Sequence, residues 1–286
     1  MRQIVIISGK GGTGKTVITG AFAALAENKV MADCDVDAAD LHLLLEPNIK
    51  QRYVFKGGVT AFINKELCTR CGKCREVCRF DAIGENFIVD PISCEGCAFC
   101  SFICPVKAIE MRENTPGEWF ISDTRFGPMV HAKLGVAEEN SGKLVAQVRK
   151  RAKEIAKEQN RDWVIIDGAP GTGCPVIASI TGVDCALVVT EPTLSGLHDA
   201  ERVISVAKHF GILTKLLVNK YDLNVEMTEK IEEYCRRNNI SLIGRIGFDK
   251  SVVKAMVERK TIIEYSDEKA KEEISKIWNA LQNSLK

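Results

Sequence analysis

A glycine-rich stretch near the start of the chain carries a pattern suited to phosphate binding. It reads GKGGTGKT, lies between an apolar run at 4–7 and a helix-like stretch at 17–27, and would place inward-turned backbone N–H groups at a positive helix end. Lys15 would reach the β- and γ-phosphates of a nucleotide, and the Thr16 hydroxyl would hold Mg²⁺. A glycine-rich turn without a ligand is the alternative, which we disfavour because every position and both flanks match. The expected nucleotide-binding residues of this loop are Gly9, Lys10, Gly11, Gly12, Thr13, Gly14, Lys15 and Thr16.

Several carboxylates follow the short strand expected at 30–32, namely Asp33, Asp35 and Asp37. In an open α/β sheet, ligands bind beyond the carboxyl ends of parallel strands, so these side chains are candidates for nucleotide chemistry. Helix capping and compensation of a helix dipole are the alternative roles. We expect Asp40, a little further on, only to cap a helix or face solvent.

A second carboxylate, Asp167, ends the apolar run at 163–166. This is the position at which a phosphate-loop protein needs a group that contacts Mg²⁺, directly or through water. The following loop, GAPGTG at 168–173, is rich in glycine and can move. We expect Gly171 of this loop to contact the nucleotide, and a plain strand-to-loop turn is the alternative.

Cysteines are concentrated in one part of the chain, since eight of the twelve lie between positions 68 and 104. They form two runs with the spacing C-x-x-C-x-x-C-x-x-x-C, which resembles that of bacterial ferredoxins. In such proteins three cysteines of one run and the last cysteine of the other bind one [4Fe–4S] cluster. The ligand sets implied here are Cys68, Cys71, Cys74 and Cys104 for one cluster, and Cys94, Cys97, Cys100 and Cys78 for the other.

A zinc ion is the alternative to an iron–sulfur cluster as the group that these cysteines bind. Four-cysteine zinc sites usually use two separated pairs rather than triplets at two-residue spacing, so we favour iron–sulfur clusters. The first run has Arg79 at the position where the second run has Pro105. This difference affects the turn after the last cysteine and leaves the cysteine ligands unchanged. A module of roughly fifty residues with few large apolar side chains also needs a bound metal group to cross-link it in order to fold.

Outside the cysteine-rich part, strands alternate with helices throughout. We therefore expect an α/β fold: a doubly wound parallel sheet of the P-loop NTPase type, interrupted by a small α+β bacterial-type ferredoxin module. The expected division is 1–57 and 113–286 for the main domain and 58–112 for the module. The net charge of +1 gives no reason to expect nucleic acid. Without a signal peptide or a long apolar span, we expect a cytoplasmic chain.

Taken together, these motifs resemble the MinD/Mrp-type deviant Walker A P-loop ATPases that carry an inserted ferredoxin domain. The deviant feature is Lys10, whose alternative role is that of an exposed lysine in a polar loop. The resemblance implies ATP, Mg²⁺ and two [4Fe–4S] clusters as cofactors. It also implies a nucleotide-driven dimer, of two copies or with a related chain, in which Lys10 reaches the partner's nucleotide. Lys10, Lys15 and Asp35 would be catalytic, with Asp35 orienting the attacking water and Asp37 or Asp33 as alternatives.

The base is expected to be adenine, read by Asn219. The segment 219–222 reads NKYD, which also fits the guanine-reading motif of GTPases. The second GTPase marker, Asp-x-x-Gly, is absent, because Pro170 stands three residues after Asp167. GTP is therefore the disfavoured alternative.

The implied function is ATP hydrolysis coupled to electron transfer through the two clusters. The alternatives are a cluster carrier or scaffold of the Mrp type, with an apo-protein as client, and a MinD-like spatial organiser that cycles on a membrane. Complete ligation of both clusters favours electron transfer, whereas a labile cluster at Cys174 would favour the carrier. We expect Cys174 to be a structural thiol. We expect the apolar stripe of the last helix, about 267–285, to dock on the domain's own sheet, so a membrane partner is disfavoured.

Overall fold

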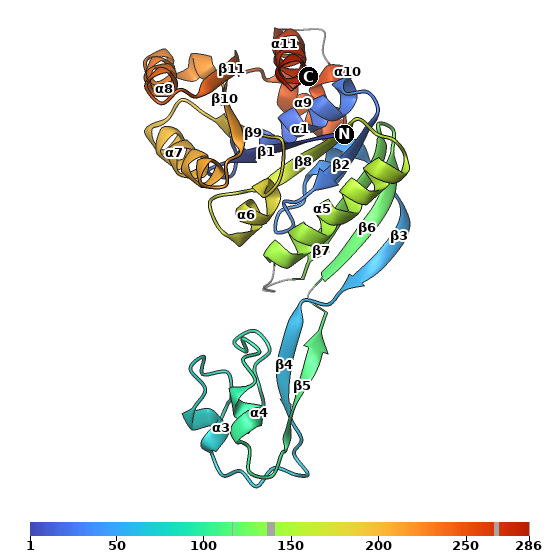
Figure 1. Ribbon diagram of the computed structural model, residues 1–286, viewed down its shortest axis with the longest axis vertical. Helices are drawn as coiled ribbons and strands as arrows, with labels where there is room; N and C mark the ends of the chain where they lie inside the picture. The colour runs from blue at the N-terminus through green and yellow to red at the C-terminus, as the bar shows by residue number, and fades with distance from the viewer. Residues whose placement is uncertain (116, 136–140, 266–268, 286) are drawn as a thin grey trace. The chain divides into compact units, whose positions relative to one another are not determined.

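The computed structural model describes residues 1–115, 117–135, 141–265 and 269–285, which divide into two compact units (Figure 1). The first contains Met1–Arg52, Trp119–Lys133 and the chain from Ser141 onward, and the second is built mainly from Tyr53–Glu118. The module expected at 58–112 lies within the second unit.

Among the described residues, the first unit is organised around a nine-stranded sheet. β1 is central and lies between β9 and β8, and every residue of β1 after Arg2 is buried. Such an apolar strand is typical of a parallel sheet that is covered on both faces, and β1 pairs parallel with both neighbours. The sheet order is β11 (Ser241–Ile246), β10 (Leu213–Asn219), β9 (Cys185–Thr190), β1 (Arg2–Ser8), β8 (Trp163–Pro170), β2 (Lys29–Asp33), β7 (Gly127–Leu134), β6 (Gly117–Thr124) and β3 (Asn48–Phe55).

Helices cover both faces of this sheet (Figure 1). One face carries a large apolar cluster that joins strand residues to α1, α2, α9, α10 and α11. On the other face, α5 packs on α6 and both contact strands, while α7 contacts β9 and β10. The helices are α1 (Lys15–Leu25), α2 (Leu41–Leu45), α5 (Ser141–Glu158), α6 (Cys174–Ile180), α7 (Leu194–His209), the 3₁₀ turn η1 (Tyr221–Leu223), α8 (Val225–Arg237), α9 (Ser251–Val257), α10 (Ile262–Tyr265) and α11 (Lys269–Ser284). The predicted doubly wound α/β architecture is thereby confirmed.

The last helix docks on the first unit, as predicted. Its apolar stripe is buried, and the Trp278 ring lies 5.0 Å from the Phe22 ring of α1, measured between centroids. The expected start at about 267 falls partly outside the described residues, since α11 is described from Lys269. No helix in the described part of the chain combines the length and apolarity needed to cross a membrane.

The second unit is small and has few apolar side chains to bury. An antiparallel ribbon of β4 (Gly58–Ile63) and β5 (Ile109–Asn114) supports two short helices, α3 (Lys73–Glu76) and α4 (Phe99–Ile103). Its described core has one large, buried aliphatic residue from each of three segments, and cysteines and a few other apolar side chains pack around them. The buried core residues are Ala61, Ile63, Cys74, Ile83 and Ile109, with Cys68, Cys78, Phe87, Val89, Cys94, Cys100, Cys104 and Met111 packed against them.

Candidate functional site

The glycine-rich loop connects β1 to α1, and three side chains of α1 converge on Asp167 at the end of the neighbouring strand β8. Lys15 Nζ donates a hydrogen bond of 2.8 Å to Asp167 Oδ1, and Thr16 Oγ1 donates one of 2.9 Å to Asp167 Oδ2. Thr19, which the sequence did not single out, donates a third bond of 2.9 Å to Oδ1. Parallel pairing of β1 with β8 puts Asp167 opposite Ile6, next to the start of the loop. The structure thus brings Lys15, Thr16 and Asp167 together, and their roles toward phosphate and Mg²⁺ stay predictions.

Glycines are required in this loop for two different reasons. Gly14 has a φ of +90°, and a Cβ there would lie 2.3 Å from the side-chain amide of Asn219. A Cβ at Gly11 or Gly12 would meet nothing within 4 Å. Gly14 therefore allows close packing beneath the loop, while Gly11 and Gly12 face open space in which a phosphate can approach the backbone.

Asn219 and Gly171 also lie at this loop. The Asn219 side chain donates a 2.8 Å hydrogen bond to the Thr13 carbonyl, so it supports the loop backbone. Its contact with a nucleotide base stays a prediction. The Gly171 amide donates a 2.9 Å bond to the Ser8 carbonyl, which ties the end of β8 to the beginning of the phosphate loop. At Gly9, the close packing of Asp199 excludes any larger residue, because a Cβ there would lie 2.4 Å from backbone atoms of Asp199. The sequence did not reveal this contact.

The three carboxylates after β2 differ sharply in environment. Asp33 and Asp35 are buried, whereas Asp37 is exposed. Asp35 Oδ2 lies 3.3 Å from Lys15 Nζ. Burial raises the pKa of Asp35 despite the opposing effect of Lys15, and burial together with the charge of Asp167 raises the pKa of Asp33 well above its usual value. Of the candidates, Asp35 is the one in contact with the phosphate-loop lysine.

Lys15 is the cation that offsets these buried carboxylates. Burial alone would lower its pKa, but Asp167 and Asp35 together outweigh that effect and hold the pKa of Lys15 above its ordinary value. Within the described residues, Thr13 Oγ1 and Asp33 Oδ2 are buried here without a hydrogen-bond partner. Unpaired buried polar atoms are rare in folded proteins, so these atoms indicate that a polar ligand, ion or water completes the site.

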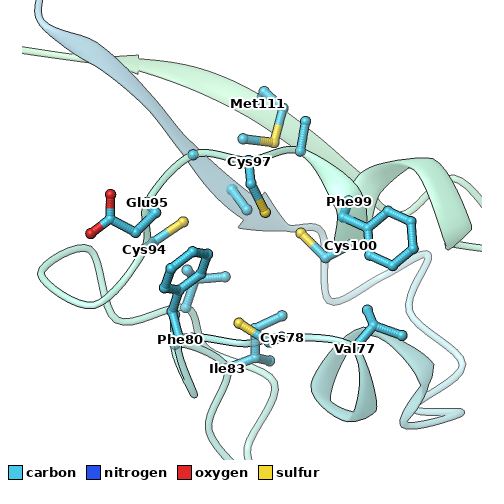
Figure 2. A pocket seen from close by; sticks show the side chains of 15 residues that line it. Val77, Cys78, Phe80, Ile83, Cys94, Glu95, Cys97, Phe99, Cys100 and Met111 are labelled. Atoms are coloured by element: carbon cyan, nitrogen blue, oxygen red, sulfur yellow. The ribbon is translucent and has the colours of Figure 1, made fainter.

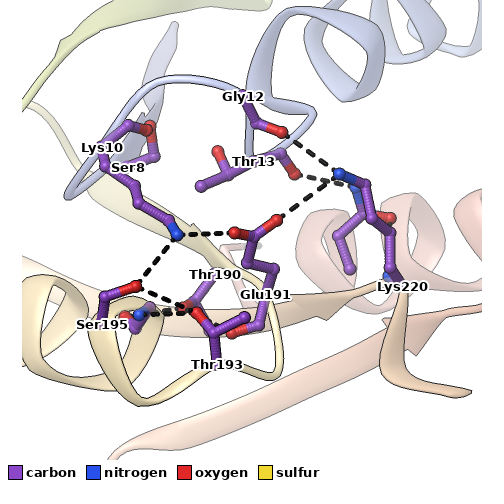
Figure 3. Close-up of polar contacts among 11 residues, drawn as sticks. Ser8, Lys10, Gly12, Thr13, Thr190, Glu191, Thr193, Ser195 and Lys220 are labelled. Carbon is purple, nitrogen blue, oxygen red and sulfur yellow. Dashed lines mark hydrogen bonds and ion pairs between the residues drawn. The ribbon is translucent and has the colours of Figure 1, made fainter. Parts of the chain in front are cut away.

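Lys10 forms contacts within its own subunit (Figure 3). Its Nζ lies 2.6 Å from Glu191 Oε1 and donates a 3.2 Å hydrogen bond to Ser195 Oγ. Lys220 Nζ lies 3.5 Å from Glu191 Oε2 and donates a 3.3 Å bond to the Gly12 carbonyl. Although partial burial opposes the effect, these two lysines lower the pKa of Glu191. The position of Glu191 just after β9 was visible in the sequence, but its pairing with Lys10 was not.

The eight clustered cysteines line two separate cavities in the second unit. One cavity contains Cys78, Cys94, Cys97 and Cys100, and Figure 2 shows their sulfur atoms directed toward a common space. The other contains Cys68, Cys71, Cys74 and Cys104. Each cavity thus collects three cysteines of one run and the last cysteine of the other run, as in the two expected ligand sets, and their role as cluster ligands stays a prediction.

The cysteines are not grouped as ligands of a single metal ion. Among the described residues, no three His, Cys, Asp or Glu side chains approach closely enough to bind one ion. Zinc would bring thiolate sulfurs to about 2.3 Å from one common point. A cluster of several iron and sulfide atoms occupies more space and keeps its four thiolates farther apart. Each cavity offers four cysteines, which is the donor set that a [4Fe–4S] cluster uses.

Comparisons with known proteins agree with the geometry of the first unit. The CobQ/CobB/MinD/ParA nucleotide binding domain matches residues 4–262. An uncharacterised protein of Methanocaldococcus jannaschii is 36% identical over 99% of this chain and 97% of its own length. The septum site-determining protein MinD of Bacillus subtilis is 24% identical over 88% of this chain and 78% of its own length.

Solved structures show the same fold. The cell division ATPase MinD of Pyrococcus furiosus superimposes with a TM-score of 0.61 at 20% identity, covering 99% of each chain. MinD of Pyrococcus horikoshii, solved with Mg-ADP, gives a TM-score of 0.61 at 18% identity, covering 99% of this chain and 96% of that one. Since the family match extends over most of the sequence, the chain belongs to the CobQ/CobB/MinD/ParA nucleotide-binding domain family.

Proposed function

We propose that this chain is an ATPase that forms a nucleotide-driven dimer and couples ATP hydrolysis to electron transfer through two [4Fe–4S] clusters. The observation that carries the proposal is the partition of the eight cysteines, in which each predicted ligand set lines one cavity although its members come from two runs. The family membership supports the nucleotide half of the proposal.

In the nucleotide half, Lys15 binds the β- and γ-phosphates and Thr16 and Asp167 hold Mg²⁺. The related MinD structure from Pyrococcus horikoshii contains Mg-ADP, which is the ligand type expected here. Lys15 is paired with Asp167 and Asp35. On nucleotide binding, Lys15 would pair with phosphate in place of the two carboxylates, and Asp167 would bind Mg²⁺. Asp35 would then be available to accept a hydrogen bond from the attacking water.

Lys10 provides the link between nucleotide and dimer. For Lys10 to reach a partner's nucleotide, its ammonium group has to leave Glu191 and Ser195. Lys220 lies beside the other carboxylate oxygen of Glu191, so this carboxylate keeps a cation when Lys10 departs. The exchange therefore replaces one ion pair by another, and the phosphates of the second subunit supply the attraction.

In the cluster half, Cys68, Cys71, Cys74 and Cys104 hold one cluster and Cys78, Cys94, Cys97 and Cys100 hold the other. When bound, the clusters supply one-electron carriers of low potential. The chain surrounds both sets with the small apolar core of the second unit. With four thiolates per cluster, each cluster is hard to release, which favours electron transfer over the carrier function.

The two alternatives are less well supported. A carrier would need a labile cluster. Cys174, at the start of α6, is an exposed thiol of the first unit, but the other cysteines of that unit are buried, so it has no exposed second cysteine in the described part of that unit with which to share a cluster. A spatial organiser that binds membranes through the last helix would need an exposed apolar stripe there. The stripe of α11 is instead buried, with Ile274, Ile277, Trp278 and Leu281 in the core of the first unit.

The test uses anaerobically purified full-length protein. We would measure iron per chain and the rate of cluster re-oxidation by a viologen dye, with and without MgATP. We expect about eight iron atoms per chain, from two four-iron clusters, and a re-oxidation rate that changes with MgATP. The variant Lys10→Ala should keep its iron and lose the ATP response, while Cys174→Ser should behave like the wild type.

Other outcomes would replace the proposal. If MgATP leaves the rate unchanged while iron moves to an added apo-ferredoxin, the clusters are cargo and the carrier function is correct. If the chain binds zinc in place of iron, the electron-transfer function is wrong and the nucleotide half remains.

A further inference from the structure

The two cysteine cavities carry side chains of opposite charge in their linings. Lys73 is part of the lining of the first cavity, that of Cys68, Cys71, Cys74 and Cys104. Glu95 is part of the lining of the second cavity, that of Cys78, Cys94, Cys97 and Cys100, and its carboxylate is directed away from the sulfur atoms (Figure 2). The pseudo-symmetric module is therefore asymmetric in the charged residues that flank its two cysteine sets.

The surrounding sequence extends this asymmetry. Residues 65–79, which contain the first run, include five basic and two acidic side chains. Residues 80–106, which contain the second run, include four acidic side chains and no basic one. These charged side chains are all exposed.

Hydrogen bonds to sulfur favour the first cavity as well. The Arg70 amide donates to Cys68 Sγ over 3.4 Å, and the Ala108 amide donates to Cys104 Sγ over 3.2 Å. Both of these acceptors belong to the first set. The amides of Arg75 and Ser101 act on Cys74 and Cys100 from equivalent positions of the two runs, so they do not distinguish the cavities.

Charge and hydrogen bonding both tune the reduction potential of an iron–sulfur cluster. A cluster gains one negative charge on reduction, so a nearby cation or N–H donor stabilises the reduced form and a nearby anion destabilises it. We propose that the cluster held by Cys68, Cys71, Cys74 and Cys104 has the higher reduction potential, and that Lys73 and Glu95 help to set the difference. This inference rests on the proposed function, because it requires that both clusters are present.

An electron on the module would accordingly rest at the first cavity. Transfer from the second cavity to the first is then downhill, and a donor that reduces the second cluster supplies electrons to the first. The direction follows from side chains of this chain alone.

A redox titration of the anaerobic full-length protein, followed by electron paramagnetic resonance at low ionic strength, tests the order. Low ionic strength is needed because exposed charges are screened within about 10 Å at 0.1 M salt. We expect two resolved one-electron steps. Lys73→Gln should shift the more positive midpoint downward and leave the other nearly unchanged. Glu95→Gln should shift the more negative midpoint upward, so that each variant narrows the gap.

The matched control is Lys276→Gln, which removes one exposed positive charge from α11 of the first unit, where Lys276 pairs with Glu272. It should move neither midpoint. The inference is overturned if Lys73→Gln moves the more negative midpoint, if neither Lys73→Gln nor Glu95→Gln moves a midpoint, or if the wild type shows a single step. Iron content separates this failure from that of the proposed function. Protein with about eight iron atoms per chain and the wrong order contradicts only the inference, whereas protein without iron contradicts both.

Discussion

The nucleotide site and the cysteine cavities assemble their functional groups in different ways. In the first unit, Lys15, Thr16 and Thr19 already contact Asp167, and a large apolar cluster beneath the sheet holds α1 in place. In the second unit, the cysteines are themselves part of a core with few other apolar residues. The nucleotide site is thus preorganised by the fold. In the second unit the candidate ligands are themselves packing residues, so we expect its fold to depend on what the cysteines bind.

The largest expected effect is the loss of the second unit when iron is removed. Treatment with a chelator under anaerobic, reducing conditions should unfold the cysteine module, because its core is too small to fold without a cross-link. The first unit should keep a cooperative thermal transition. Limited trypsin digestion with mass spectrometry would measure this, since the module carries exposed cleavage sites at Lys65, Arg70, Lys73, Arg75 and Arg79.

The control for iron removal is nucleotide binding to the chelated protein, which should be retained. If the chelated module resists trypsin as well as the iron-loaded one does, the contrast between the two units is wrong. The second unit would then be preorganised by packing alone.

The next effect concerns the preorganised site itself. Lys15→Met should lower the free energy of unfolding of the first unit by about 3 to 5 kcal/mol, because it leaves the buried Asp167 and Asp35 without their cation. Urea unfolding followed by circular dichroism measures this change. The matched variant is Lys10→Met, whose partly exposed pair with Glu191 contributes at most about 1 kcal/mol.

Equal losses in the two lysine variants would contradict the assignment of Lys15 as the buried counter-ion.

Much of both sites was predictable because their residues are close in sequence or follow a fixed spacing. The phosphate loop is one uninterrupted segment, and Asp167 follows a strand that its apolar run makes evident. The two expected cysteine sets come from the resemblance of the spacing to that of bacterial ferredoxins, because each set combines two runs. Local chain geometry leaves few ways to place three cysteines at two-residue intervals around one centre.

Other features required the order of strands in space. Lys10 and Glu191 are 181 positions apart, and they meet because β9 lies next to β1 in the sheet. The support of the phosphate loop by Asn219 likewise depends on β10 following β9 in that order. Among Asp33, Asp35 and Asp37, burial separates the candidates, and burial depends on how the loop after β2 packs. Sequence pattern gives the types of these residues but not these contacts.

The smallest expected effect comes from Asp33, the buried carboxyl beside this network. Its pKa is raised mainly by burial and by the charge of Asp167, so the folded state binds a proton that the unfolded state releases above the ordinary pKa of aspartate. Stability from this group is therefore present at acid pH and is lost as pH rises from that ordinary value through the raised one. Asp33→Asn removes the titration, and its amide can donate where Asp33 Oδ2 now has no partner among the described residues.

We expect Asp33→Asn to be nearly equal to the wild type at about pH 3.5, below the ordinary pKa of aspartate, and more stable than the wild type by at least about 1 kcal/mol at pH 8. Urea unfolding at the two pH values measures the difference. Asp37→Asn is the matched control, because Asp37 follows the same strand but is exposed, and it should change stability little at either pH. A destabilised Asp33→Asn at pH 8 would mean that the ionised carboxylate is part of the charge network around Lys15. In that case the first unit holds three charged carboxylates on one lysine before nucleotide or Mg²⁺ binds, and it too depends on its ligand.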